Sequence, residues 1–557
     1  MLFALLLHII IIAGCLWTGF LFYTCILKTK EKKPFIFYAV TGLIVHSTIV
    51  QVAVLFLPIN LFFSAVLFFL LTIIAALKIK IFREFCKMFV AEISSFPISV
   101  KAFIVFLWLM IVMINSGSTM MDDTESYHIQ TIKWIQEHGT VPGLVNLHER
   151  FGFNSSWFSS VALFNFSSKT TAGFTLLNSI LSVLLGYWLI SKYDQLRKEN
   201  NLQAAFAILI ILVTCLIVWP LLRGNAATTN YDFITTGIVL VLFTEIFLSS
   251  NNEISPSIEW IVWPTYLFTV RIINFPLLLL SVMAVIILIK QKKTRALLFS
   301  MTYCLLLIIP FLIRNTIIAG YPFYPATSFG LFNVDWKPDP QLTEKLIEYI
   351  KYYNRVSTTY LEIEQTKALG TNWVPSWFKY LFSFDKVLVI SGLIGIVLSI
   401  IKIFINRNKS AALLLSISIL WLILWFFISP DPRFVYGILL SGVLLLAYYL
   451  ISLVKNIQLL KSVADILVIL IIAGTTFYSI SKLWKQKEYR NWIKPVQLPQ
   501  PPVKEFVIDG ITFRIPDPIN NNWNARCYGT ELPCLYKIDP RLKPRGKDIR
   551  NGFRLEK

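Results

Sequence analysis

The sequence has few charged residues and few histidines, and it lacks the short motifs of zinc and nucleotide-binding enzymes. Only 15% of the 557 residues are charged and only 5 are histidine. No CxxC pair and no HExxH run occurs, so no zinc motif is present. Glycine-rich phosphate loops are also absent, which argues against a nucleotide substrate.

Hydrophobic residues make up 56% of the chain, and the mean hydropathy is +0.67. This composition is typical of a polytopic membrane protein. In a membrane protein an excess of Lys and Arg usually sets the orientation of the helices. We therefore attribute the net charge of +20 to orientation and expect no nucleic-acid partner. The apolar segment 2–26 is too long and lacks the basic start of a cleaved signal peptide, so we interpret it as a helix.

A spanning helix needs about 20 mostly apolar residues, and many segments approach that length. They predict an all-α polytopic membrane protein with about 14 transmembrane helices, within a range of 12–14. The expected segments are 2–26, 36–57, 60–77, 100–116, 173–190, 203–220, 232–249, 257–270, 274–289, 296–313, 386–404, 410–428, 433–453 and 463–481.

Alternate loops between these segments are basic, which the positive-inside rule assigns to the cytoplasm. The basic loops are 28–33, 78–87, 191–198, 290–295, 406–409 and the loop with Lys455 and Lys461. The remaining loops and both termini are then extracytoplasmic. The long outer loops are 117–172 and 314–385.

Three regions follow from this topology: N-terminal helices at 1–99, a transmembrane core at 100–481 and an extracytoplasmic α/β tail at 482–557. In the tail, the run 505–516 predicts a β-hairpin turning at Asp509-Gly510. Outside the cytoplasm, Cys527 and Cys534 are expected to form a disulfide. Two free thiols on a cytoplasmic tail are the alternative.

The outer loop 117–172 begins with an acidic pair, Asp122 and Asp123, directly after an apolar segment. An amphipathic helix is expected from Asp123 to His138, with Gly139 as its stop. We expect this helix to lie in the membrane interface with Trp134 as an anchor.

A carboxylate at this position could deprotonate a hydroxyl group as a general base. Asp122 and Asp123 could instead bind a divalent cation, Mg or Mn, through oxygen ligands. Capping of the following helix is the structural alternative. The later outer loop contributes a rigid turn at 314–325, a helical run at 341–356 and two interfacial tryptophans within 372–382.

Several arginines lie near expected outer helix ends, where the positive-inside rule predicts few basic residues. The planar N–H donors of the arginine guanidinium group bind phosphate well, which suits a phosphorylated substrate. Ion pairs with carboxylates or contacts with lipid headgroups are the alternatives. One of these arginines, Arg433, follows Asp431 across Pro432. The structural interpretation is an expected internal ion pair, and the functional alternative is the rim of a cavity. The candidate substrate-binding residues are Glu125, Tyr127, His128, His148, Arg150, Asn154, Arg223, Arg271, Arg314, Tyr321 and Arg433.

The acidic pair in DDTESYH, with the RNTIIAGYPFYP and SPDPRF elements and the tail run RCYGTELPC, resembles the polytopic glycosyltransferase C superfamily, in an uncharacterised bacterial branch. The resemblance implies a GT-C-like core in a bacterial inner membrane. It further implies an inverting transferase that moves a sugar from a polyprenyl-phosphate donor to a hydroxyl acceptor on a glycan, lipid or protein. Asp123 would be the base, with Asp122 as the alternate, and Arg271 or Arg314 would hold the lipid phosphate.

Other readings of the same residues are a transporter or flippase of lipid-linked saccharide, a polysaccharide polymerase, and a non-catalytic assembly protein. A transporter would be expected to carry ionisable residues deep within its helices. An assembly protein would tolerate loss of Asp122 and Asp123.

Overall fold

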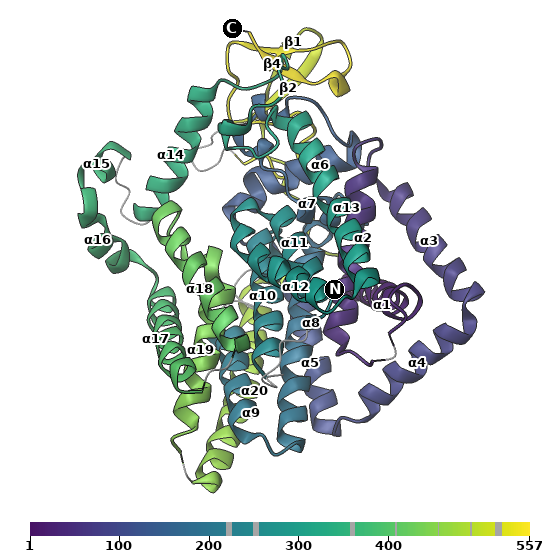
Figure 1. The fold of residues 1–557 in the computed structure, drawn as a ribbon. Helices are drawn as coiled ribbons and strands as arrows, with labels where there is room; N and C mark the ends of the chain where they lie inside the picture. Colours follow the sequence, from purple (N-terminus) through teal and green to yellow (C-terminus); the bar gives the residue numbers. More distant parts are fainter. Residues whose placement is uncertain are drawn as a thin grey trace.

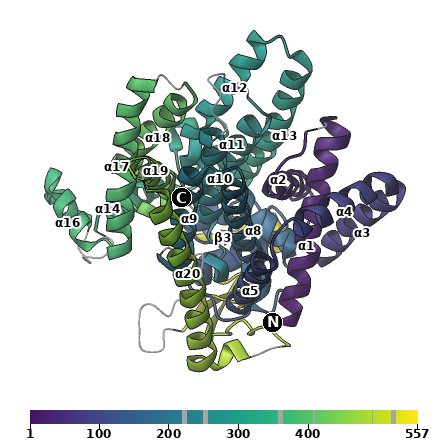
Figure 2. The ribbon, with the colours of Figure 1, turned by 90° about the horizontal axis from the view of Figure 1, so that it is seen from below.

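The computed structural model describes residues 1–29, 31–218, 225–248, 256–356, 363–406, 409–454, 456–490, 493–517 and 526–556. In this part of the chain nearly all regular structure is helical, and the strands are confined to a small tail at one end (Figure 1). The helices pack into a body whose N-terminal part is shown in purple and whose last spanning helices are shown in green (Figure 2).

Eleven helices of the described chain are long and apolar enough to cross a membrane, judged by length and composition. They confirm the expected class, a helical protein with many membrane-type spans. These helices are α1 with η1 (Leu2–Ile26), α2 (Phe35–Ala53), α5 (Ile98–Asn115), α8 (Thr171–Lys198), α10 (Tyr231–Leu248), η7 with α12 (Ile272–Lys290), α13 (Thr294–Ala319), α17 (Ser383–Asn406), α18 (Lys409–Ile428), η10 with α19 (Pro432–Ile451) and α20 (Ile457–Lys485).

The other expected segments also form helices, but short or bent ones. α3 (Leu61–Leu77) and α4 (Ile79–Ser94) meet at an angle of 98° and together make at most a twelfth span. α9 (Leu202–Val213) and its continuation η5 (Thr214–Val218), like α11 (Glu259–Val270), are shorter than the length that a bilayer requires.

Two of the expected basic loops are helical. Residues 79–94 form α4, so Cys86 lies in a helix rather than in a loop. Residues 191–198 complete the last turns of α8. Lysine and arginine are good helix formers, and a basic helix end is favoured by the helix dipole. Charge alone therefore did not mark the end of the helix in either place.

Glycines let several helices approach at backbone distance. A Cβ added to Gly395 of α17 would lie 1.8 Å from the carbonyl oxygen of Gly442 in α19. The same holds for α1 and α2, where a Cβ on Gly42 would lie 1.9 Å from the carbonyl oxygen of Cys15. Small residues allow this close packing, which stabilises helix pairs in a membrane where burial of apolar surface provides little drive.

Between α5 and α8 the chain folds into short elements at the end of the body that faces the tail. These elements are η2 (Thr124–His128), α6 (Ile129–Glu137), η3 (Leu144–Asn146), η4 (Glu149–Gly152) and α7 (Ser156–Phe164). The helix expected from Asp123 to His138 is therefore confirmed, as η2 followed by α6.

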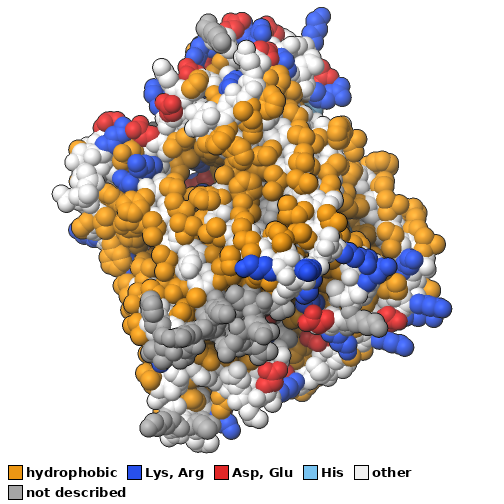
Figure 3. Space-filling view, in the orientation of Figure 1, with side chains coloured by type: hydrophobic (Ala, Val, Ile, Leu, Met, Phe, Trp, Pro, Cys, Tyr) orange, Lys and Arg blue, Asp and Glu red, His pale blue; other side chains and the backbone are white. Residues whose placement is uncertain are grey.

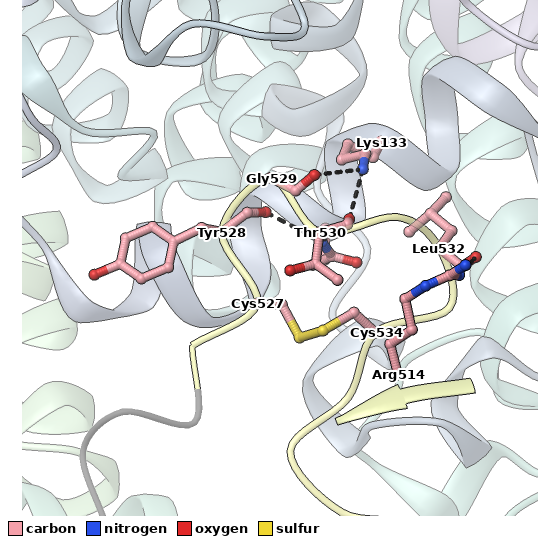
Figure 4. Close-up of a disulfide and its surroundings, with 9 residues drawn as sticks. Lys133, Arg514, Cys527, Tyr528, Gly529, Thr530, Leu532 and Cys534 are labelled. Carbon is pink, nitrogen blue, oxygen red and sulfur yellow. Dashed lines mark hydrogen bonds between the residues drawn. A yellow bond between two sulfur atoms is a disulfide. The ribbon is translucent and has the colours of Figure 1, made fainter. Parts of the chain in front are cut away.

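The expected membrane-interface position of this helix is wrong. Trp134 is 0% exposed, and Ile129, Ile132 and Ile135 are also 0% exposed. The polar side of α6 is covered by the tail, because Lys133 Nζ donates hydrogen bonds to the carbonyl oxygens of Gly529 (3.1 Å) and Thr530 (2.6 Å) (Figure 4). A helix with both faces covered by protein has no free face for lipid.

The long outer loop contains η8 (Thr327–Phe329), α14 (Pro340–Val356), α15 (Ile363–Ala368), η9 (Gly370–Asn372) and α16 (Trp373–Tyr380). α14 confirms the helical run expected at 341–356. The two tryptophans expected at the interface, Trp373 and Trp377, are instead only 5% and 7% exposed. Both rings pack against Phe426 at the end of α18, and Trp377 Nε1 donates a hydrogen bond to the Pro430 carbonyl oxygen.

The tail contains the predicted hairpin, β1 (Val503–Ile508) and β2 (Ile511–Pro516), paired antiparallel with Phe506 opposite Phe513. Its turn residues Asp509 and Gly510 both have positive φ, as a tight hairpin turn requires. A second pair, β3 (Leu542–Pro544) and β4 (Phe553–Leu555), was not predicted. Cys527 and Cys534 form the expected disulfide (Figure 4).

The burial of α6 leads to a stability prediction. Replacing Trp134 by Ala should lower the free energy of unfolding by about 3–5 kcal/mol, because a large side chain leaves a cavity in the core. Trp484→Ala is the matched control, since the Trp484 residue is 80% exposed. Thermal unfolding of the purified protein in detergent measures both, and equal shifts would contradict a buried α6.

Candidate functional site

Three aspartates and three arginines meet where the helical body faces the tail. We call Asp123, Asp232, Asp431, Arg150, Arg271 and Arg433 the arginine–aspartate cluster. They come from five separate places in the chain, namely the start of η2, η4, the start of α10, the segment between α11 and η7, and the start of η10. The formal charges of the six groups balance, which makes their joint burial tolerable.

Asp123 joins two of the arginines. Its Oδ1 accepts a hydrogen bond from Arg150 at 2.9 Å, and its Oδ2 lies 3.5 Å from Arg433 Nη1. Burial alone would raise the pKa of the Asp123 carboxyl, but the charges of Arg433 and Arg150 hold that pKa below its ordinary value. Asp123 is therefore an ionised carboxylate at neutral pH.

Arg433 is the centre of the cluster. Its Nε lies 2.9 Å from Asp431 Oδ2 and 3.8 Å from Asp232 Oδ2. The ion pair expected between Asp431 and Arg433 is therefore confirmed. Asp431 also accepts a hydrogen bond from the Arg433 backbone N–H at 3.1 Å, as a cap of η10.

Asp232 is the functional-site residue that the sequence interpretation missed. It pairs with Arg271, whose guanidinium carbon lies 3.7 Å from the centre of the Phe434 ring and 5.5 Å from that of Tyr231. In the sequence, Asp232 looks like an ordinary acidic residue in the first turn of an apolar helix. The sequence feature that could have identified Asp232 is its place beside Tyr231 at the outer end of an expected helix, on the same side as the acidic loop.

Tyr127 and His128 line the same site. The Arg150 guanidinium lies 5.4 Å from the centre of the Tyr127 ring. His128 Nδ1 lies 2.8 Å from Thr229 Oγ1, while its Nε2 has no hydrogen-bond partner among the described residues. Burial lowers the pKa of His128 to about 3, so its ring is neutral and does not supply a cation for a phosphate.

Asp122 and Glu125, two further candidates, face the tail instead of the cluster. Arg526 Nη2 donates to Asp122 at 2.6 Å, and Arg526 Nη1 donates to Glu125 at 2.5 Å. Tyr528 Oη donates to the same Glu125 carboxylate at 3.0 Å. These contacts tie the disulfide loop to the segment that carries Asp123.

His148 is a packing residue at the edge of the site. Its Nδ1 accepts a hydrogen bond from the backbone N–H of Arg150 at 3.1 Å, which helps to fix η4. Its ring lies 4.7 Å from that of Tyr536, and Tyr536 Oη donates to Glu149 at 3.2 Å. The tail therefore also braces the element that carries Arg150.

Arg314 differs from the cluster arginines. It is 4% exposed and donates a hydrogen bond to the side-chain oxygen of Asn154, another candidate residue. No carboxylate pairs with Arg314 in the described part of the chain, and its Nε has no hydrogen-bond partner there. A buried guanidinium without a counter-charge is costly and is poised to accept an anion.

Four candidates have no described contact with the cluster. Arg314 and Asn154 are hydrogen-bonded to each other, but neither contacts a cluster residue in the described part of the chain. Tyr321 is 1% exposed, and its ring lies 4.5 Å from Lys337 Nζ without a contact to the cluster. Arg223 lies outside the described residues.

The residues present do not suit the divalent cation that the acidic pair suggested. The carboxylates of Asp122 and Asp123 already form ion pairs with arginine guanidinium groups. No group of three or more His, Cys, Asp or Glu side chains that could hold a metal ion occurs within the described ranges. The donors around Asp123 are cations, which repel a metal ion and attract an anion.

The surface around the site is apolar and open at one point. Figure 3 shows a broad belt of hydrophobic side chains over the helical body, and beside α14 a hollow opens in that belt with acidic atoms in its depth. α14 itself lies close to the cluster, because Asn354 donates a hydrogen bond to Ser429 Oγ, two residues before Asp431. The hollow offers a route to charged groups from the apolar surface.

The apolar spans and the charged site define a polytopic helical membrane protein with a polar centre at the tail-bearing end of its helical body. The family model described as a domain of unknown function (DUF8201) matches residues 1–440, and the protein belongs to that family. The match includes all six residues of the arginine–aspartate cluster and stops before the tail. Neither the curated proteins nor the solved structures give a match.

The tail contacts lead to a prediction about local stability. Arg526→Ala removes the ion pairs to Asp122 and Glu125, and hydrogen bonds to charged groups contribute about 1.5–3 kcal/mol each. Amide hydrogen exchange in 526–536 and 122–130 should therefore become roughly tenfold faster or more. Arg550→Ala is the control, because Arg550 pairs with its near neighbour Asp548. Unchanged exchange in Arg526→Ala would show that the tail is held by other contacts.

Proposed function

We propose that this protein is an inverting glycosyltransferase that moves a sugar from a polyprenyl-phosphate donor to a hydroxyl acceptor at the outer face of a bacterial inner membrane. The observation that supports the proposal most directly is the ionised carboxylate of Asp123 between two half-buried arginines, Arg150 and Arg433. This pairing of a proton acceptor with phosphate-binding cations is what such a transfer needs. The hollow in the apolar belt exposes acidic atoms to the apolar surface, as access for a lipid-borne substrate would require (Figure 3).

In the proposed reaction, the acceptor hydroxyl attacks the anomeric carbon of the donor sugar from the face opposite to the lipid phosphate. A carbon–oxygen bond forms to the acceptor as the bond to the phosphate oxygen breaks. The hydroxyl proton passes to the Asp123 carboxylate, and the electron pair of the broken bond leaves on the polyprenyl phosphate. The products are the glycosylated acceptor and the free polyprenyl phosphate.

Asp123 is a weak base while two arginines hold its pKa low. An arriving phosphate competes for the same guanidinium donors, because arginine binds phosphate and carboxylate with the same planar fork. As the arginine contacts move to the phosphate, the Asp123 carboxylate loses positive neighbours and its pKa rises. Donor binding would thereby prepare the base for the acceptor.

Arg314 is the better of the two arginines considered for the leaving phosphate. Arg271 is already neutralised by Asp232 and covered by Phe434, whereas Arg314 is buried without a carboxylate in the described chain. A cation fixed in a dry site stabilises the charge that develops on a leaving group more strongly than a solvated one.

Transport of a lipid-linked saccharide is the second candidate, and one feature favours it. Ionisable groups do occur inside the helical body, including His8 and His46 at 0% exposure and Glu259 at 1%. Glu259 accepts a hydrogen bond from Tyr23, and each histidine has a hydrogen-bond partner. Such residues can line a transport path, but none belongs to the arginine–aspartate cluster.

Removing the base tests the transferase proposal. Asp123→Asn should lower turnover about 10²- to 10⁴-fold, because general-base catalysis contributes on that scale. The assay follows transfer of labelled sugar from a polyprenyl-phosphate hexose in membranes containing the protein. Asp548→Asn, an exposed residue of the tail paired with Arg550, is the control. Full turnover by a folded Asp123→Asn protein would rule out the proposed base, whereas no transfer by the wild-type protein would favour transport or assembly.

Arg314 can be tested by comparing its activity with its stability. Arg314→Gln should raise the KM for the lipid donor about tenfold, as expected for loss of one charged contact of about 1.5 kcal/mol, without lowering the unfolding temperature. Arg271→Gln should instead destabilise the protein by about 1–3 kcal/mol, because it removes the hydrogen-bonded partner of Asp232 and leaves only the longer contact to Arg433. A destabilised Arg314→Gln protein with an unchanged KM would make Arg314 a structural residue.

A further inference from the structure

Two tyrosines of α14 form an aromatic pair next to the arginine–aspartate cluster. Tyr349 and Tyr353 are one helical turn apart, and their rings stack with centroids 5.3 Å apart and an interplanar angle of 22°. They are 37% and 43% exposed, which is unusual for stacked rings that serve only to fill a core. Neither hydroxyl group has a hydrogen-bond partner among the described residues.

Hydrogen bonds fix the neighbourhood of the pair beside the cluster. Asn354, which follows Tyr353 in α14, donates a hydrogen bond to Ser429 Oγ, two residues before Asp431. Tyr536 of the tail donates a hydrogen bond from its Oη to Glu149, which precedes Arg150. The pair is therefore part of the wall of the site rather than of a remote surface.

The neighbouring Tyr352 shows that this placement is specific to one face of α14. Its ring lies 5.4 Å from Lys351 Nζ, 5.3 Å from the Arg355 guanidinium and 5.7 Å from Lys367 Nζ. These cations belong to α14 and α15. Tyr352 therefore packs among cations of its own helix and of the next one.

We propose that Tyr349 and Tyr353 form a platform that binds the sugar ring of the lipid-linked donor above Asp123. The inference rests on the proposed glycosyltransferase function and adds the place where the sugar lies. A sugar ring has an apolar face of C–H groups, which packs on an aromatic ring, and an edge of hydroxyl groups, which needs hydrogen-bonding and charged partners. Stacked phenol rings beside arginines and carboxylates offer both, with little loss of side-chain entropy on binding.

A hydrocarbon chain is not the expected ligand of the tyrosine pair, because the pair lies beside ionised groups. The described chain holds a separate apolar groove of about 420 Å³ between α9, α17 and α19, lined by residues such as Ile210, Leu388 and Val443. That groove has the chemistry for hydrocarbon, whereas the tyrosine pair lies over ionised groups. The sugar is therefore the part of the donor that the platform suits.

The test compares two ligands that differ only by the sugar, a polyprenyl phosphate that carries one hexose and the same polyprenyl phosphate without it. Their dissociation constants are measured with the full-length protein in detergent micelles. Tyr349→Ala and Tyr353→Ala should weaken binding of the hexose-bearing lipid about three- to tenfold, the range of an aromatic contact. Binding of the bare lipid phosphate should not change. Tyr353→Phe should retain the affinity because it keeps the ring, and Tyr352→Ala should behave like wild type.

The possible results distinguish failure of the platform proposal from failure of the transferase proposal on which it rests. If both lipids lose affinity equally, or neither does, in the alanine variants, the platform is wrong while the transferase proposal stands. If the wild-type protein binds the hexose-bearing lipid no better than the bare phosphate, the sugar has no site, and both proposals fail. If Tyr353→Phe is as weak as Tyr353→Ala, the hydroxyl and not the ring makes the contact, which overturns stacking.

Discussion

The ionised carboxylate of Asp123 depends on arginines brought from distant parts of the chain, and much of the architecture serves that pairing. A carboxylate moved into an apolar interior without partners would lose several kcal/mol of solvation. Arg150 and Arg433 compensate it, and Asp431 and Asp232 in turn compensate the arginines. Because the charges form one balanced set, loss of any single member leaves an unpaired charge in the others. The starts of α10 and α19 must therefore meet at η2 and η4.

Arg314 is the exception in this balanced arrangement. A protein selected only for stability would not keep a buried guanidinium whose contact in the described chain is a neutral amide. Arg271, paired with Asp232, and Arg314, which has no carboxylate partner in the described chain, therefore differ in environment, although both are arginines at the end of an apolar helix in the sequence.

The local features of the sequence predicted the structure well. Apolar length predicted helices, Asp509-Gly510 predicted a hairpin turn, and the two tail cysteines predicted a disulfide. Adjacent residues were harder to separate, since Asp122 and Asp123 share one pattern but point to different partners. Successive side chains at a helix start diverge by about 100°, so one carboxylate faces the cluster and the other faces Arg526. The neighbouring sequence does not show which of the two aspartates faces the cluster.

Long-range partners were the main omission. Asp232 looks like a helix-start acid until Arg271 and Arg433 are placed beside it. Trp134 fits an interfacial anchor by type and spacing, but its ring is fully buried and packs against Phe553 of the tail. Periodicity in the sequence predicts that a helix has two faces, but what covers each face is decided by parts of the chain that carry no matching pattern.

The contact of Arg526 with Asp122 has a consequence for biogenesis. These residues are 404 positions apart, so during synthesis Asp122 leaves the ribosome long before its partner exists. Contacts between such distant segments form late in folding, because bringing the two segments together costs loop-closure entropy before the contacts can stabilise the fold. The segment carrying Asp123 therefore remains unbraced until the last spanning helices are inserted and the disulfide loop docks. The contacts around the arginine–aspartate cluster would therefore be completed only after the whole chain has been made.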